Sequence, residues 1–161
     1  MIRWGFETIG LPEAVNYWRQ FPIRERKALE AGLKKASQML LREMKRRVPV
    51  SSGDLKKALR IRTPSKFEHI VGADSRNRYA HVVEAGRKAG AKAPPLSSRR
   101  LQRWLRQHNI PKNEWYAVAR SIGQKGILAR PFMAESLQAV GDKMFKELVV
   151  RVQRAMKRRG K

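Results

Sequence analysis

The chain has 161 residues, no cysteine, and 37 Lys and Arg against 13 Asp and Glu, which gives a formal net charge of +24. The length suits a single domain, the 42% hydrophobic residues argue against general disorder, and the lack of cysteine excludes disulfides and thiolate metal sites. Because so large a charge repels itself in a compact fold, it indicates an anionic partner: nucleic acid first, an anionic membrane surface second and an acidic protein third.

Residues 1–22 are expected to form an N-terminal arm and a short helix. The arm covers 2–9 as a strand or an extended segment, and the helix covers 12–21. The N-terminus has a single positive charge and no long apolar run, which does not fit a signal peptide. No window of the chain approaches the ~20 consecutive apolar residues of a membrane span. We therefore expect a soluble, intracellular protein.

A long amphipathic helix is predicted over 24–47, because apolar residues recur every three or four positions and the other faces are basic. Pro49 cannot continue this helix. Ser51 and Asp54, three residues apart, resemble a capping box, so a helical turn is expected to restart at about Asp54 after the flexible Gly53. An ordinary connecting loop is the alternative interpretation of this stretch. The apolar stripe of the long helix consists of Leu29, Leu33, Ala36, Leu40 and Met44.

Alternation of apolar and charged residues predicts a β-hairpin after this turn. Strands are expected over 59–63 and 67–71, joined by a turn at 64–65. After a second turn over 73–78, residues 79–86 are predicted to form a third strand. The resulting small antiparallel sheet is expected to pack on the long helix.

The following segment is predicted to be a basic loop and two short helices. The loop covers 87–100, and the helices cover 98–108 and about 112–123. Gly123 and Gly126 are expected to end the second helix. The residues predicted to face inward are Leu101, Trp104, Leu105, Trp115, Val118 and Ile122.

A second long helix is predicted to begin at Pro131, which would take the first helical position. Its apolar face is broad enough to contact more than one neighbour. Residues 153–161 are expected to be a basic, frayed tail. The expected fold is therefore one α+β domain over 1–161, in which two long helices, N-terminal and C-terminal, pack on a small antiparallel β-sheet with extra short helices.

Catalytic and metal-binding motifs are missing from the sequence. His69, His81 and His108 lack the spacing of metal ligands, and Glu84 is a single carboxylate in an apolar segment. The glycine-containing stretch at 86–92 lacks the Gly-Lys-Ser/Thr ending of a phosphate-binding loop. We therefore expect no enzymatic activity, no metal and no cofactor.

Basic residues carry the strongest functional signal. Residues 87–106 contain seven Lys and Arg and no acid, and residues 143–161 contain eight against one Glu. A solvated charged face is the ordinary explanation for one such run, but several single-sign segments favour contact with nucleic acid phosphates, without sequence readout. The candidate contacts are Lys34, Lys35, Arg42, Arg87, Lys88, Lys92, Arg99, Arg100 and Arg103.

The order of the motifs resembles the neck, or tail-completion, family of long-tailed bacteriophages, which includes relatives of the lambda minor tail protein Z. The family has a Pro-Val-x-Thr-Gly-x-Leu turn after a helix, then a Tyr-Ala…Val-Glu-x-Gly strand, then Pro-Phe at the start of the last helix. Here Ser52 replaces the usual threonine, and Ala85-Gly86-Arg87 stands where the family often has Phe-Gly-Thr. The matching residues are Pro49, Val50, Ser52, Gly53, Leu55, Tyr79, Ala80, Val83, Glu84, Gly86, Pro131 and Phe132.

This resemblance implies a non-enzymatic α+β subunit whose motif residues are structural. It implies a homo-oligomeric ring, a hexamer or dodecamer, at the head–tail junction of the virion, assembled in the host cytoplasm. The implied neighbours are head-closure or connector proteins, tail-tube or tail-terminator proteins, and DNA in the channel, with no membrane.

Two other functional classes remain open from the sequence. One is a sequence-nonspecific nucleic-acid-binding protein of the nucleoid or ribosomal type, which the net charge would suit. The other is a hydrolase or nuclease, which the missing metal-ligand clusters and activated nucleophiles argue against.

Overall fold

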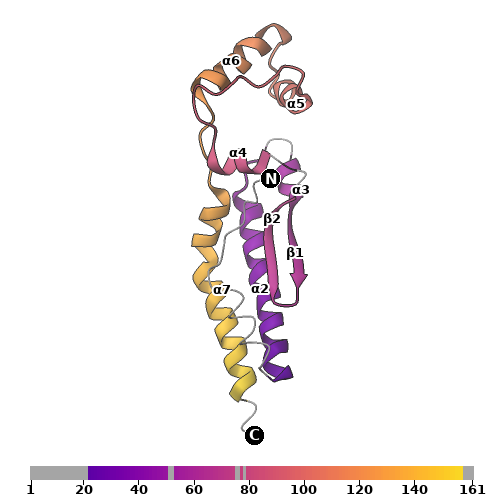
Figure 1. The fold of residues 1–161 in the computed structure, drawn as a ribbon, viewed down its shortest axis with the longest axis vertical. Coiled ribbons are helices and arrows are strands. Elements are labelled where there is room, and N and C mark those ends of the chain that lie inside the picture. Colours follow the sequence, from indigo (N-terminus) through magenta and orange to yellow (C-terminus); the bar gives the residue numbers. More distant parts are fainter. Residues whose placement is uncertain (1–21, 51–52, 75–76, 78, 158–161) are drawn as a thin grey trace.

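The computed structural model describes residues 22–50, 53–74, 77 and 79–157, apart from the side chain of Arg100. The predicted arm and short helix before residue 22 lie outside these residues, as does Ser52 of the first motif. The fold is α+β, as predicted (Figure 1). In chain order its elements are α2 (Ile23–Arg47), α3 (Asp54–Ala58), β1 (Leu59–Ser65), β2 (Glu68–Ala73), α4 (Tyr79–Ala85), α5 (Arg99–Gln107), η1 (Lys112–Glu114), α6 (Trp115–Lys125) and α7 (Phe132–Lys157).

The two long helices, α2 and α7, run antiparallel along each other and form an elongated rod (Figure 1). The predicted stripe of α2 faces inward, with Leu29, Ala36 and Met44 buried. Gly32 lies on this face, and a Cβ atom built there would be 2.8 Å from Cδ2 of Leu148 on α7. The two helices therefore approach closely at this point.

The predicted hairpin is confirmed, with β1 and β2 antiparallel and packed on α2. Leu59 pairs with Ala73 and Ile61 with Val71. The predicted turn at Pro64 and Ser65 is wrong by two residues, because both belong to β1 and the turn is at 66–67. Pro64 falls where the strand register is irregular, so its missing N–H group interrupts no regular ladder.

The predicted third strand over 79–86 is wrong, because this segment is helix α4. Its buried residues, Ala80 and Val83, are three positions apart and therefore lie on one helical face. Gly86 follows the helix with φ 73°, the left-handed conformation that commonly ends a helix. Among the described residues, the sheet has only the two strands of the hairpin.

The main core lies at the end of the rod where α2 stops and α7 begins. Five elements meet there: the end of α2, α3, β1, α4 and the start of α7. The buried cluster consists of Met44, Val48, Leu55, Leu59, Ala80, Val83 and Phe132.

The helices α5, η1 and α6 form a small lobe (residues 99–125) beyond this core (Figure 1). Both predicted helices are confirmed, and the Ser98 side chain accepts a hydrogen bond from the N–H group of Leu101 at the start of α5. Leu105 is fully buried at the centre of the lobe. Gly126 ends α6 as predicted, but Gly123 lies within that helix, where a Cβ atom would be 3.1 Å from Cα of Ala93.

Helix α7 begins at Phe132, so Pro131 stands one position before the helix and not at its first residue. The helix continues to Lys157, so residues 153–157 are helical and not part of a frayed tail. Its broad apolar face is only partly covered by the other described residues, and Phe145 remains 69% exposed.

Candidate functional site

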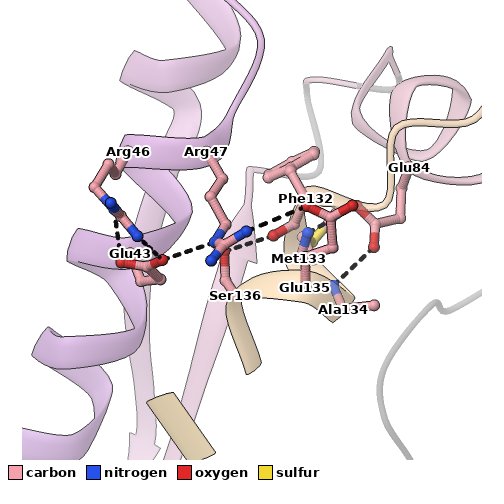
Figure 2. A network of polar contacts seen from close by, with 9 residues as sticks. All are labelled: Glu43, Arg46, Arg47, Glu84, Phe132, Met133, Ala134, Glu135 and Ser136. Atoms are coloured by element: carbon pink, nitrogen blue, oxygen red, sulfur yellow. Dashed lines mark hydrogen bonds and ion pairs between the residues drawn. The ribbon is translucent and has the colours of Figure 1, made fainter. Parts of the chain in front are cut away.

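Glu84 is a distant N-terminal cap of helix α7 (Figure 2). It stands near the end of α4, and its two carboxylate oxygens point at the first turn of α7. Oε2 accepts a hydrogen bond from the N–H group of Met133 at 2.9 Å, and Oε1 accepts one from Ala134 at 3.0 Å. A carboxylate is well suited to this position, because the N-terminus of a helix carries partial positive charge and unpaired donors.

With Glu84 in place, every backbone donor at the start of α7 has a partner. Pro131 has no N–H group, and Phe132 donates to the carbonyl oxygen of Arg130 at 2.8 Å. Met133 and Ala134 donate to Glu84, and Glu135 donates to the carbonyl oxygen of Pro131 at 2.9 Å. The backbone N–H groups at the start of α7 are therefore all hydrogen-bonded, some to the residues just before the helix and two to Glu84, about fifty positions earlier in the sequence.

Gly86 allows the chain after α4 to approach the segment that leads into α7. A Cβ atom at this position would lie 2.6 Å from the carbonyl oxygen of Ile127 and 2.8 Å from the nitrogen of Ala129. The same two segments are joined by hydrogen bonds between Arg87 and Ile127 and by a 2.7 Å bond from Arg130 N–H to the carbonyl of Val83. Only glycine fits both this spacing and the positive φ angle.

Six of the twelve motif residues therefore meet in one place, which we call the motif junction. It consists of Leu55, Ala80, Val83, Glu84, Gly86 and Phe132. Gly53 lies nearby as the N-cap of α3, with φ 75°, and no side chain caps that helix. Pro49 is half-buried, whereas Val50 and Tyr79 are exposed, so these three residues contribute less to the junction than the motif suggested.

An ionic cluster lies beside the motif junction (Figure 2). Glu43 accepts hydrogen bonds from Arg46 at 2.6 Å and from Arg47 at 2.7 Å, and Arg47 also reaches Glu135 of α7 at 3.4 Å. The bonds from Arg46 and then Arg47 lower the pKa of Glu43 from 4.5 to about 2. Glu43 precedes these arginines by three and four residues, a helical spacing that could have shown the cluster in the sequence.

The candidate phosphate contacts divide into two groups instead of forming one surface. Lys34, Lys35 and Arg42 are exposed along α2. The others belong to the segment over 87–103, which ends within the first helix of the lobe. In this segment Lys88, Lys92 and Arg99 are exposed.

Two residues of the second group are engaged within the fold. The guanidinium group of Arg87 donates to the carbonyl oxygen of Lys92, and the backbone of Arg87 pairs with Ile127. Arg103 forms an ion pair with Asp54 at 3.1 Å. These contacts give Arg87 and Arg103 structural roles that the sequence did not indicate.

The histidines occupy unrelated positions. Nδ1 of His69 lies 2.8 Å from the hydroxyl oxygen of Ser37, and His108 stacks on Trp104 and donates from Nδ1 to its carbonyl oxygen at 2.9 Å. His81 is exposed on α4. Within the described residues, no group of three or more His, Asp or Glu is placed to hold a metal ion. No described helix is long and apolar enough to cross a membrane.

Residues 23–86 match a bacteriophage family model. Its description is "Bacteriophage HK97-gp10, putative tail-component", and the match covers less than half of the chain. The matched segment runs from the first turn of α2 to Gly86, and so contains the first two motifs and Glu84. No curated protein and no solved structure matches the chain. The match supports a head–tail or tail family of phages, and it does not extend to the narrower likeness to lambda protein Z.

Proposed function

We propose that the chain is a structural virion protein of a tailed phage, a neck or tail-completion protein of the lambda Z type. It joins the head connector to the tail as a homo-oligomeric ring around the DNA passage. The match to a phage tail component over 23–86 is the observation that carries this proposal. The motif junction extends the argument to the rest of the chain, because Glu84 of the matched segment caps α7, which lies outside it.

The rod supports assembly into a ring. Its helix α7 leaves large apolar side chains uncovered, including Phe145 at 69% and Met156 at 50% exposure. In a closed ring, one face of each subunit contacts a different face of the next subunit. Such contacts between identical subunits would cover these apolar side chains. A hexamer or a dodecamer is the proposed copy number.

The proposed neighbours in the virion are head-closure or connector proteins on one side and tail-tube or tail-terminator proteins on the other. DNA passes through the channel, and the net charge of +24 suits a surface that meets this polyanion. The protein is assembled in the host cytoplasm and ends at the head–tail junction. Its role is not enzymatic, which agrees with the structural contacts made by Glu84, Glu43 and Arg103.

Two measurements test this proposal together. Negative-stain microscopy and mass photometry of the purified protein should show rings, and mass spectrometry of purified virions should detect the chain in a copy number that matches the ring. A protein that stays monomeric at all concentrations and is absent from virions would overturn the proposal.

The net charge also favours a second candidate, a sequence-nonspecific nucleic-acid-binding protein of the nucleoid or ribosomal type. This candidate predicts that the chain coats host nucleic acid and does not enter particles. Fractionation of infected cells separates the two, because a nucleoid or ribosomal protein would sediment with host chromosome or ribosomes rather than with virions.

A further inference from the structure

A cationic groove runs between the start of α2 and the second half of α7. We call it the α7 groove. It is about 790 Å³ in volume and open to solvent. The start of α2 and the end of α7 lie at the end of the rod opposite the lobe (Figure 1). Its cationic residues are Arg24 of α2 and Lys143, Lys146, Arg151, Arg154 and Lys157 of α7.

The cations of α7 form a regular row on one side of the helix. From Lys143 the row continues at Lys146, Arg154 and Lys157, with Val150 between them, so the steps are three, four, four and three residues. Positions at these intervals lie above one another on a helix. At ~1.5 Å per residue, the row from 143 to 157 spans about 21 Å.

Negative charge is scarce in the groove. Its only lining carboxylate among the described residues is Glu147, which forms an ion pair with Arg151 at 2.7 Å. The row therefore keeps a large excess of positive charge at short range. Such an arrangement costs free energy in the isolated chain because like charges repel, unless an anionic partner occupies the groove.

Helix geometry alone does not explain the row. Cations in the last turn of a helix are favoured by its partial negative charge, and this accounts for Arg154 and Lys157. The effect fades within the last turn, whereas Lys146 lies about three turns and Lys143 about four turns before the end of α7. These two lysines point to a ligand outside the chain.

We infer that the α7 groove binds the phosphate backbone of duplex DNA. Protein interfaces are depleted in lysine and rich in aromatic residues at their centres, but the described residues that line this groove include three lysines and no aromatic side chain. The row spreads four cations over about 21 Å, and a duplex carries one phosphate per ~1.7 Å of its axis, so phosphates are available along the whole length of the row. This inference rests on the proposed function, which supplies the DNA. It places the DNA contact on the α7 groove, which contains none of the contact residues predicted on α2 and over 87–103.

Two charge-matched variants test this inference in the full chain. The groove variant is Lys143→Gln/Lys146→Gln/Arg154→Gln, and the comparison variant is Lys34→Gln/Lys35→Gln/Arg42→Gln. Each removes two lysines and one arginine from exposed helix positions. The probe is a fluorescently labelled DNA duplex of mixed sequence, whose binding is followed by anisotropy over a range of salt concentrations.

The groove variant should bind DNA more weakly, and its slope of log affinity against log salt should be shallower by about 2.7. This value follows because each lost phosphate contact removes about 0.9 from the slope. The comparison variant should keep the wild-type slope. A Lys143→Arg/Lys146→Arg variant, which keeps the charge, should also bind as the wild type does, and thermal unfolding should show that all variants are folded.

The remaining outcomes overturn the inference. A shallower slope in the comparison variant alone would place the DNA contact on α2, which leaves the proposed function intact. Equal losses in both variants would show that only total charge matters. A wild-type protein that does not bind the duplex also overturns the inference, and ring formation by the same sample then decides separately whether the proposed function survives.

Discussion

Replacing Glu84 with alanine removes the carboxylate that pairs the first turn of α7. Two backbone donors, of Met133 and Ala134, lose their acceptors in a half-buried position. Loss of a helix cap costs about 0.5–2 kcal/mol, and a hydrogen bond to a charged group contributes about 1.5–3 kcal/mol. Because both donors are partly accessible to water, we expect the free energy of unfolding to fall by about 2 kcal/mol.

This loss is measurable in two ways. For a chain of this size, about 2 kcal/mol lowers the midpoint of thermal unfolding by roughly 4–8 °C. Native-state hydrogen exchange reports the cap itself, since the amides of Met133 and Ala134 should exchange faster in Glu84→Ala. Glu84→Gln keeps one oxygen acceptor but no charge, so its effect should be about half as large.

The control for this prediction is Asp142→Ala, which removes the same charge from an exposed position of α7. In a chain of net charge +24, losing any carboxylate adds to repulsion, and this control measures that part alone. If Glu84→Ala and Asp142→Ala lower the midpoint equally, or if the two amides keep their protection, the capping role is refuted.

Three further predictions follow from the same structure. Gly86→Ala should destabilise the chain by more than about 1–2 kcal/mol, which is the cost of a left-handed alanine, because the new Cβ atom would also meet backbone atoms of Ile127. Gly90 also has a positive φ of 76° but open space around it, so Gly90→Ala should show only the conformational cost. Chemical denaturation measures both free energies of unfolding. Leu105→Ala should lower the stability of the lobe by about 2–5 kcal/mol, because it leaves a cavity at a fully buried position. Amide exchange should become faster over 99–125 and stay the same in α2 and α7. Equally faster exchange in α2 and α7 would contradict the separation of lobe and rod. Because the pKa of Glu43 is lowered from 4.5 to about 2, its stabilising contribution is complete above pH 4.5 and is lost as the pH falls towards 2. The difference in unfolding midpoint between wild type and Glu43→Gln should therefore shrink over this interval, and a difference that is constant with pH would contradict the role of the two arginines.

Local periodicity was sufficient to predict much of the fold. The stripe through Leu29, Ala36 and Met44 defined α2, and alternation around Ile61 and Val71 defined the hairpin. It failed in the short segment over 79–86, which is predicted to be a third strand but forms helix α4. Eight residues are too few to separate the helical period from the strand period, and the contacts of Ala80 and Val83 with the core decide for a helix.

The functional surfaces depend on contacts that one sequence does not show. Glu84 was predicted to be a lone carboxylate, because its partners at the start of α7 are about fifty positions away. The sequence shows that residues 143–161 are basic. It does not show that several of them lie beside Arg24. That alignment follows from the antiparallel packing of α2 and α7, which is a property of the folded rod.

A cryo-electron microscopy reconstruction of the head–tail junction in the proposed virion tests the ring most directly. We expect a closed ring of copies between the connector and the tail tube, with the α2–α7 rods packed side by side. A junction built entirely from other proteins, with no density that fits the rod, would contradict it.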